Sequence, residues 1–331
     1  MTNTKTDKLF ACIGILTTVC IVLNLLSVAY KFLRPSKLHK YLHHGKQTYA
    51  FVTGATDGVG RSMAYELAKS GFNLILHGRN SEKLQAITED LQTQYPAIET
   101  RKLVCDASKD LLDSSTLYNL HKVLKDVHIS ILINNVGGMG CLPPSCLYQA
   151  YESYTGEQID TVINVNLRFM VQLTRILIPL LDHSTSKTAA SNKRLPSLIL
   201  NMGSVGAHGS PYISVYAGTK AFVASFSNSL SMEMKIDGKD INVQALIIGE
   251  TRSATHIVKD GMMVPHSNSL ARSALKMVGS DRETFVSGCF PHWMAKVFVQ
   301  VMPVYVSNML FADAIKKLKA AHEKRVASLA D

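Results

Sequence analysis

Short apolar runs alternate with longer amphipathic stretches from residue 48 onwards. Six runs rich in aliphatic and β-branched residues predict strands at 48–54, 73–78, 99–106, 129–135, 197–203 and 241–249, of which the third has the weakest pattern. Because these runs lack polar alternation, we expect both faces of each strand to be buried. Amphipathic stretches predict helices at about 59–70, 81–94, 109–126, 156–182, 214–236 and 266–279. The alternation predicts an α/β fold with a doubly wound parallel sheet.

An uncharged apolar segment, residues 9–30, precedes this alternation. As an α-helix rising ~1.5 Å per residue it would be about 33 Å long, enough to cross a bilayer core. A cleaved signal peptide is the alternative, because residues 27–29 resemble a signal-peptidase site. The segment exceeds the ~7–15 apolar residues usual in a signal peptide, and the sequence has no Asn-x-Ser/Thr sequon. Basic residues are more frequent after the segment than before it, which predicts a single-pass anchor with the rest of the chain in the cytoplasm.

The C-terminal region is apolar but interrupted. Residues 289–311 contain His292, Lys296 and Pro303, so we expect this segment to dock at a membrane surface or pack on the domain, with a kink at the proline. A basic amphipathic helix is predicted at 314–325. These patterns divide the chain into an anchor with a basic flank (1–40), one α/β domain (47–285) and an apolar and amphipathic extension (286–331).

Charge and cysteine content narrow the classes of partner. The formal net charge is +10, but basic residues gather only at 31–46 and 316–325, which flank apolar segments. Such clusters favour a membrane surface over nucleic acid. None of the six cysteines lies in a Cys-x-x-Cys motif or at metal-ligand spacing from a histidine, which predicts a reducing compartment and no metal site. Cys141 and Cys146 are expected to be free thiols, with a disulfide between them as the alternative.

A glycine-rich loop joins the first predicted strand to the helix that follows it. Glycines at such a junction allow a tight turn and close approach of the backbone to a pyrophosphate, which the helix N-terminus attracts. The candidate cofactor ligands in this loop are Gly54, Thr56, Gly58, Val59 and Gly60. Their position between a strand and a helix predicts a dinucleotide site.

The ends of the later strands indicate which dinucleotide binds. An acidic residue at the end of the second strand would bind the ribose 2′-hydroxyl of NAD, but Gly78 and Arg79 stand there. The guanidinium favours the 2′-phosphate of NADP(H). Asp106, after the third strand, is a candidate acceptor for the adenine amino group. Asn135, after the fourth strand, and Thr251, after the sixth, are further candidate cofactor residues.

A tyrosine and a lysine four residues apart are candidates for acid–base chemistry. Three such pairs occur, namely Tyr65/Lys69, Tyr118/Lys122 and Tyr216/Lys220. Only Tyr216 begins a predicted helix behind a strand that ends in a polar residue, Ser204. Residues i and i+4 share a helix face, so Tyr216 and Lys220 project together. We expect Lys220 to lower the phenol pKa from about 10, so that Tyr216 protonates a ketone oxygen to which Ser204 donates a hydrogen bond.

Taken in order, these motifs resemble the short-chain dehydrogenase/reductase family over residues 47–255. The resemblance is carried by Thr53-Gly-x-x-x-Gly-x-Gly60, Asn134-Asn-x-Gly137, Asn166, Ser204 and Tyr216-x-x-x-Lys220. It implies one Rossmann-type reductase domain and a catalytic tetrad of Asn166, Ser204, Tyr216 and Lys220, the last two also contacting the cofactor. Asn166 would hold a water in a proton relay to Lys220, and Asn164 is the competing candidate for that role.

Further features are similar to one membrane-bound branch of the family. The TGATDGVG loop, the valine of NNVG, the anchor and His292-Trp293 resemble very-long-chain 3-oxoacyl-CoA reductases and 17β-hydroxysteroid dehydrogenases. This resemblance implies an NADPH-dependent ketoreductase in the endoplasmic reticulum membrane, facing the cytosol. Its substrate would be a lipophilic ketone such as a 3-oxoacyl-CoA or a steroid, with a specialised-metabolite carbonyl as a third candidate. Members of the family often form homodimers through the helices that carry Asn166 and Tyr216.

Two departures from the family pattern motivate a second hypothesis. Tyr216 follows Ser204 by one residue fewer than is usual, and Ile248-Gly249 stands where the family usually has Pro-Gly. A catalytically silent protein that binds nucleotide and serves as a membrane scaffold would tolerate both changes. Such a scaffold would also keep its function in a Tyr216→Phe variant, whereas an enzyme would lose most turnover.

Overall fold

The computed structural model describes most of the chain as two compact units. Described are residues 4–43, 45–109, 112–183, 195–253, 261, 263–280 and 284–327. The first unit is Met1–Ser36 and the second is Lys37–Asp331.

The first unit consists of one long helix, α1 (Thr4–Leu33). Within it, residues Thr6–Tyr30 have a mean hydropathy of 2.5 and are long and apolar enough to cross a membrane. None of the most apolar stretch is buried inside the protein, and side chains such as Leu16 and Leu23 are mostly exposed. A core helix of a soluble protein would not leave these side chains exposed, so α1 is a candidate membrane-spanning helix.

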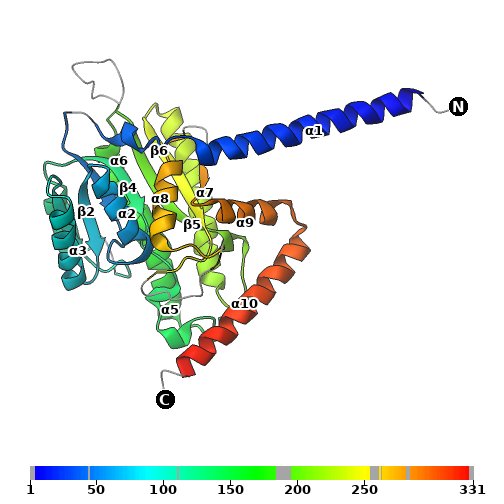
Figure 1. Ribbon diagram of the computed structural model, residues 1–331. Helices are drawn as coiled ribbons and strands as arrows, with labels where there is room; N and C mark the ends of the chain where they lie inside the picture. Colours follow the sequence, from blue (N-terminus) through cyan, green and yellow to red (C-terminus); the bar gives the residue numbers. More distant parts are fainter. Residues whose placement is uncertain are drawn as a thin grey trace. The chain divides into compact units, whose positions relative to one another are not determined.

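The second unit is built on a seven-stranded parallel sheet (Figure 1). Its strands are β1 (Thr48–Val52), β2 (Asn73–Gly78), β3 (Thr100–Val104), β4 (His128–Asn134), β5 (Ser197–Ser204), β6 (Ile241–Ile248) and β7 (Phe285–Ser287), in the order β3-β2-β1-β4-β5-β6-β7. Successive strands are added on one side of β1 up to β3 and on its other side from β4 onwards, so the strand order switches between β1 and β4. Phe51 of β1 is in register with Ile75 of β2 and with Leu132 of β4. Ligands of open α/β sheets bind at the carboxyl ends of strands beside such a switch point.

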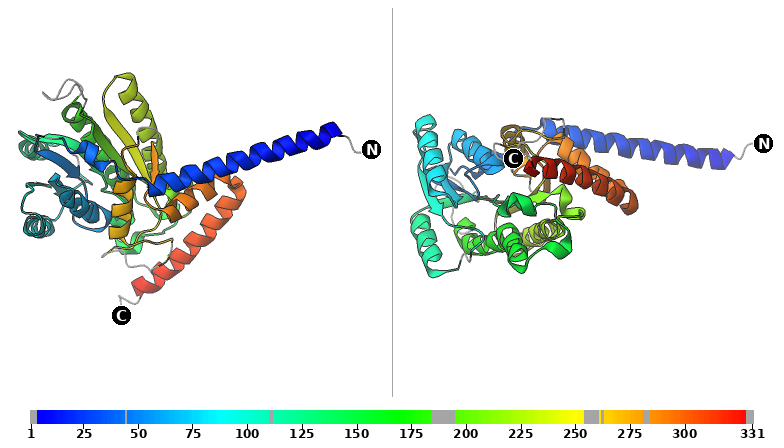
Figure 2. Two further views of the ribbon diagram at one scale, coloured as in Figure 1. Left: turned by 45° about the horizontal axis from the view of Figure 1, so that its top comes forward. Right: turned by 90° about the horizontal axis from the view of Figure 1, so that it is seen from below.

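Helices cover both faces of this sheet. They are α2 (Gly58–Lys69), α3 (Ser81–Gln94), α4 (Ser114–Leu124), α5 (Gly156–Ile163), α6 (Phe169–Leu181), α7 (Ser214–Ile236) and α8 (Ser267–Met277). Helix α2 packs against α8 on one face, and α5 packs against α7 on the other (Figure 2). Short 3₁₀ helices lie at Leu38–Tyr41, Met139–Cys141, Pro144–Cys146, Tyr151–Ser153 and Val205–His208. The doubly wound architecture predicted from the alternating pattern is confirmed.

Two local features differ from the predicted elements. The helix expected at 156–182 contains a π-helical segment, Asn164–Arg168, between α5 and α6. A seventh strand, β7, pairs in parallel with β6 at the sheet edge. With three residues, β7 is too short to carry a hydrophobic period, so no pattern in the sequence predicts it.

The C-terminal extension forms two helices, α9 (Phe290–Val301) and α10 (Val304–Ala327). The predicted interruption at Pro303 is confirmed, since α9 ends just before this residue. Within the described residues, only α1 qualifies as a candidate membrane span. Both C-terminal helices nevertheless expose large apolar side chains, namely Phe290, Met294, Phe298, Val301, Val304, Tyr305, Met309 and Leu310.

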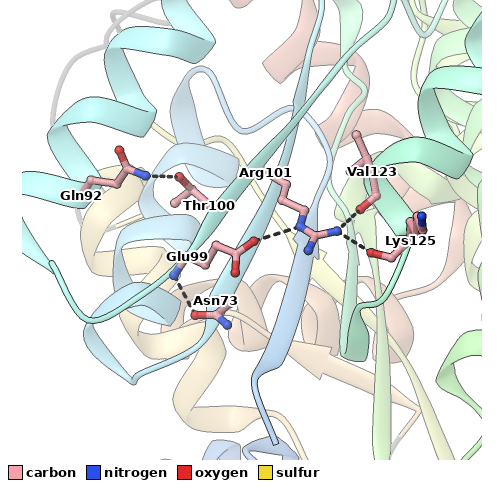
Figure 3. A network of polar contacts seen from close by, with 7 residues as sticks. All are labelled: Asn73, Gln92, Glu99, Thr100, Arg101, Val123 and Lys125. Atoms are coloured by element: carbon pink, nitrogen blue, oxygen red, sulfur yellow. Dashed lines mark hydrogen bonds and ion pairs between the residues drawn. The ribbon is translucent and has the colours of Figure 1, made fainter.

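A polar network fixes the outer strand β3 (Figure 3). The Arg101 guanidinium donates hydrogen bonds to Glu99 Oε1 at 3.0 Å, to Val123 O at 3.1 Å and to Lys125 O at 2.6 Å. The backbone N–H of Glu99 donates to Asn73 Oδ1 at 2.8 Å. These bonds join β3 to β2 and to the end of α4, and they occupy carbonyls that would otherwise lack partners.

Candidate active site

The glycine-rich loop between β1 and α2 has a backbone that requires glycine. Gly54 and Gly58 have φ angles of +63° and +58°, in the left-handed region that other residues adopt at a cost. A Cβ on Gly60 would overlap the Gly54 carbonyl oxygen and the side chain of Asn135. The loop leads into the N-terminus of α2, where the Gly58 N–H is capped by Asp57 Oδ1 at 2.6 Å. The positive end of the helix dipole at this position favours phosphate oxygens.

Residues at the end of β4 hold this loop in place. The backbone N–H groups of Asn135 and Val136 both donate to Thr53 Oγ1, at 2.8 and 3.0 Å. The Asn135 side-chain amide donates to the carbonyl oxygens of Thr53 and Gly54, at 3.0 and 3.2 Å. Asn135, predicted as a cofactor residue, thus lies at the loop with its amide N–H groups directed to the loop backbone.

A buried histidine supports the same loop from β2. His77 Nδ1 accepts a hydrogen bond from Gly54 N at 3.3 Å, and Nε2 donates to Cys105 O at 3.2 Å. Burial lowers the pKa of His77 to about 4, so the ring is neutral at physiological pH. His77 was not among the predicted site residues, although a histidine in an otherwise apolar strand indicates a polar contact.

The ends of β2 and β3 form the corner predicted for the adenosine ribose. A Cβ on Gly78 would lie 2.5 Å from Thr56 Cγ2, so glycine is needed there, and Arg79 follows with its side chain exposed. Asp106 Oδ1 accepts hydrogen bonds from Ser108 N and Oγ, at 3.0 and 2.9 Å. Burial alone would raise the pKa of Asp106, but these bonds and the charge of Arg79 outweigh it and lower the pKa. Asp106 is therefore an ionised acceptor.

Ser204, Tyr216 and Lys220 meet at the carboxyl end of β5. Tyr216 lies in the first turn of α7, and the Lys220 Nζ lies 5.7 Å from the centroid of the Tyr216 ring. Lys220 is buried and donates from Nζ to Met202 O at 2.8 Å. Ser204 is the last residue of β5, and its hydroxyl is close enough to the phenol of Tyr216 to act on the pKa of that group. The short Ser-to-Tyr step therefore still brings the two hydroxyls together.

The expectation that the pKa of the Tyr216 phenol is lowered is wrong. Burial raises the pKa of Tyr216 above its usual value, and the nearby Ser204 hydroxyl opposes that rise only in part. Burial also lowers the pKa of Lys220 to about 8. The phenol is therefore a protonated group in this site, which suits a proton donor. The sequence pattern could not indicate how deeply these two side chains are buried.

Asn166 lies in the π-helical segment beside these residues. Its Oδ1 accepts a hydrogen bond from Gly138 N at 2.6 Å, and its Nδ2 donates to Val162 O at 3.0 Å. A Cβ on Gly137 would lie 2.9 Å from Asn166 Oδ1 and 3.4 Å from Lys220 Nζ, so the two side chains flank this glycine. Single-turn π-helical segments inside α-helices are frequent at functional sites because they redirect side chains.

The competing residue, Asn164, points elsewhere. Its Nδ2 donates to Ser108 O at 3.1 Å, in the connection that follows β3. Of the two asparagines, only Asn166 therefore lies beside Lys220.

The substrate side of the site includes residues that the sequence analysis did not assign to it. Tyr148 has a φ of +58°, and it is close enough to Tyr216 to raise the pKa of that phenol. His292, from α9, is buried, and a Cβ on Gly249 would lie 3.0 Å from its ring. Thr251 hydrogen-bonds back to Gly249 O at 3.3 Å. Tyr148 and His292 lie 68 or more positions from Tyr216 in sequence, so no local spacing reveals them.

Residues 184–194, 254–260 and 262 lie outside the described residues. Cys141 and Cys146 beside the site are free thiols, as expected.

Comparison with known proteins settles the family. Residues 48–261 match the family model described as short chain dehydrogenase. The chain belongs to the short-chain dehydrogenase family. Among curated family relatives, the very-long-chain 3-oxoacyl-CoA reductase of Neurospora crassa is 31% identical and covers 86% of this chain and 80% of its own length. The enzyme of the same name from Schizosaccharomyces pombe is 32% identical, over 82% of this chain and 77% of the relative.

Solved structures of short-chain dehydrogenases share the fold. One from Sphingobium yanoikuyae in complex with NADPH is 27% identical, has a TM-score of 0.59, and matches 76% of this chain and 93% of its own. The family membership and these relatives identify an oxidoreductase that uses NADP(H) and interconverts CH–OH and C=O groups. The resemblance inferred from the glycine loop and from Tyr216-x-x-x-Lys220 is confirmed.

Proposed function

We propose that the protein is a membrane-anchored ketoreductase that reduces the 3-oxo group of a long-chain acyl-CoA to an alcohol. The observation that carries this proposal is the meeting of Ser204, Tyr216 and Lys220 at the carboxyl edge of the sheet, beside the glycine loop. Two neighbouring hydroxyl groups can polarise and protonate a carbonyl oxygen placed between them.

In this reaction NADPH, when bound, supplies hydride to the carbonyl carbon. Tyr216 donates its hydroxyl proton to the carbonyl oxygen, and Ser204 donates a hydrogen bond to the same oxygen. The protonated phenol, whose pKa burial raises, is suited to this role. Lys220 stabilises the phenolate that remains, because its ammonium lies within reach of the ring in a poorly solvated site. Asn166, locked to Gly138, would position the water that restores the proton.

The cofactor is proposed to lie along the carboxyl edge of β1, β2 and β4. Gly54, Gly58 and Gly60 would receive the pyrophosphate at the N-terminus of α2. The exposed guanidinium of Arg79 would bind the 2′-phosphate, for which its planar fork of donors is well shaped.

Two observations favour a lipophilic thioester as substrate. The relatives from N. crassa and S. pombe carry the name very-long-chain 3-oxoacyl-CoA reductase. The C-terminal helices, which expose apolar side chains, also reach the substrate side: His292 of α9 lies against Gly249, and His322 of α10 contacts Tyr148 with ring centroids 5.6 Å apart. An acyl chain could follow this apolar surface from a membrane to the carbonyl site.

The proposed location is the endoplasmic reticulum membrane with the catalytic unit in the cytosol. Helix α1 supports an anchor by its length and apolar composition. The basic residues that follow the apolar segment support the cytosolic orientation. We also propose a homodimer through α7, which exposes Phe222, Met232 and Ile236. The mass of the detergent-solubilised protein tests the dimer.

The substrate proposal is tested with the full chain in detergent micelles. NADPH oxidation would be followed with a long-chain 3-oxoacyl-CoA, with the same acid lacking CoA, and with a steroid ketone. The proposal expects turnover that is fastest with the acyl-CoA and is lost in Tyr216→Phe but kept in Tyr118→Phe, a matched change in an exposed Tyr-x-x-x-Lys pair. Faster turnover with the steroid would contradict the substrate class, and no turnover with any ketone would support the scaffold hypothesis.

A further inference from the structure

Three histidines from distant parts of the chain meet at the amino-terminal edge of the sheet. His43 follows the short helix at Leu38–Tyr41, His128 begins β4, and His183 follows α6. Their candidate ligand nitrogens all lie within 4.8 Å of one another. His43 and His183 are buried, at 3% and 8% exposure. Because β4 carries the dinucleotide loop contacts at its other end, this cluster is separate from the active site.

Backbone carbonyls fix the orientation of two of the rings. His43 Nε2 bonds Pro196 O at 2.9 Å, and His183 Nε2 bonds Ile129 O at 2.8 Å. A carbonyl oxygen only accepts hydrogen bonds, so in both rings Nε2 carries the hydrogen and Nδ1 keeps its lone pair. Histidines that ligate metals usually donate their outer N–H to a carbonyl or carboxylate in this way.

The contact between His43 and His128 shows where a cation would fit. His43 Nδ1 lies 2.7 Å from His128 Nε2, and the rings of His128 and His183 stack with centroids 4.1 Å apart. Because an imidazole lone pair lies in the plane of its ring, one of these two stacked rings must rotate for both to bind the same ion. Since His43 Nδ1 is the acceptor, a proton on His128 Nε2 joins the two rings. Zinc–imidazole bonds of about 2.0–2.1 Å place tetrahedral nitrogens about 3.3 Å apart. Metal binding at His128 Nε2 therefore requires this proton to move to Nδ1 of the same ring, and the two rings to separate by roughly half an ångström.

We propose that His43, His128 and His183 bind one divalent transition-metal ion, with Zn²⁺ as the favoured ion. Neutral imidazoles suit zinc, and three protein ligands leave one position for water. A bound ion would link the segment before β1 to the start of β4 and to the end of α6. Its role is to bind the ion and hold these segments together, and no step of the ketone reduction depends on it.

The positive charge of Lys46 near His128 limits the affinity of this site for a metal ion. His43 and His183 are buried, which favours the neutral rings that bind a metal ion. Lys46 also acts on His128 and disfavours positive charge there. Removal of this charge in Lys46→Gln should therefore tighten metal binding.

The test uses the full chain in detergent, purified with a tag that contains no histidine and stripped with a chelator. Titration with Co²⁺, read from its visible spectrum, and competition with Zn²⁺ give the stoichiometry and affinity. We expect one equivalent with the spectrum of a tetrahedral site, and a melting temperature about 5 °C higher at 100 times the dissociation constant. His43→Gln and His183→Gln should each weaken binding at least about tenfold. His39→Gln, an exposed histidine of the same segment, should leave binding unchanged.

Replacement of one histidine by another metal-binding residue keeps the test decisive if the glutamine variants fold poorly. His183→Cys should still bind cobalt and add a thiolate charge-transfer band, while NADPH binding reports that the domain is folded. Wild-type protein that binds neither Co²⁺ nor Zn²⁺ in the titration, or equal affinity in wild type and His43→Gln, would overturn the proposal. The three residues would then be a hydrogen-bonded histidine cluster only.

Discussion

The side chain of Lys220 reaches from α7 to β5 and donates a hydrogen bond to the carbonyl oxygen of Met202 at 2.8 Å. This bond fixes the ammonium beneath the Tyr216 ring, 5.7 Å from its centroid. Burial at this position lowers the pKa of Lys220 to about 8. The lysine therefore changes charge within the range of ordinary kinetic measurements, whereas Tyr216, whose pKa is raised, stays protonated.

The pH profile of ketone reduction should follow Lys220. Its ammonium form stabilises the phenolate, so kcat/KM is expected to be flat below about pH 8 and to fall as the lysine loses its proton above that pH. In Lys220→Arg, which stays charged, the fall should move to higher pH even if the rate is lower. A profile unchanged between wild type and Lys220→Arg would contradict this assignment.

His77 should make stability depend on pH in the acidic range. Its folded-state pKa of about 4 lies below the ordinary value of 6.5, so the unfolded chain binds more protons between these values. The stabilising contribution is therefore complete above pH 6.5 and is lost progressively down to about pH 4. Urea unfolding of wild type and His77→Leu at several pH values measures the difference, which should shrink on acidification. A constant difference would show that His77 stays neutral in both states.

Arg79 should decide between the two nicotinamide cofactors. Loss of a charge-assisted hydrogen bond of about 1.5–3 kcal/mol predicts that Arg79→Glu weakens NADPH binding roughly ten- to hundredfold while NADH binding is kept or improved. Lys69→Glu makes the same charge change at another exposed position and should alter neither affinity. Fluorescence titration of both variants with both cofactors gives the comparison. Equal losses in the two variants would point to net charge rather than to a specific phosphate contact.

Gly60 should tolerate no side chain. A Cβ there overlaps the Gly54 carbonyl and the Asn135 amide, so Gly60→Ala must displace the loop. We expect a loss of about 1–3 kcal/mol in unfolding free energy and a larger relative loss of NADPH affinity. Gly156→Ala, at the start of α5 with nothing within 4 Å of the new Cβ, is the matched control. Normal cofactor affinity in Gly60→Ala would refute the close approach.

Much of this architecture was predictable because local signals and tertiary packing agree. The helix expected at 214–236 is found at Ser214–Ile236, since its apolar period and its place after a buried strand both reflect the same core. Tyr216 was chosen among three Tyr-x-x-x-Lys pairs because its helix follows a predicted strand that ends in Ser204, and the strand pattern of the sequence predicts this order. Tyr118, in an otherwise identical spacing, lies exposed on α4.

The features that the sequence did not predict depend on how deeply a side chain is buried or on contacts between residues that are far apart in the sequence. The direction of the Tyr216 pKa shift follows from burial, which a sequence pattern does not measure. His292 reaches Gly249 only through the folding of the C-terminal extension. His43, His128 and His183 are too far apart in sequence to form a ligand motif, and they meet only because β4 lies between β1 and β5.

The central claim is that the phenol of Tyr216 protonates the reduced carbonyl. Its most direct test is single-turnover NADPH oxidation by the full chain with a 3-oxoacyl-CoA, in Tyr216→Phe and Tyr118→Phe, with NADPH affinity measured in parallel. We predict that Tyr216→Phe loses about 10²-fold or more in rate at nearly unchanged NADPH affinity, and that Tyr118→Phe matches wild type. A Tyr216→Phe rate within about twofold of wild type would contradict the account, because a proton donor of this kind contributes far more than that.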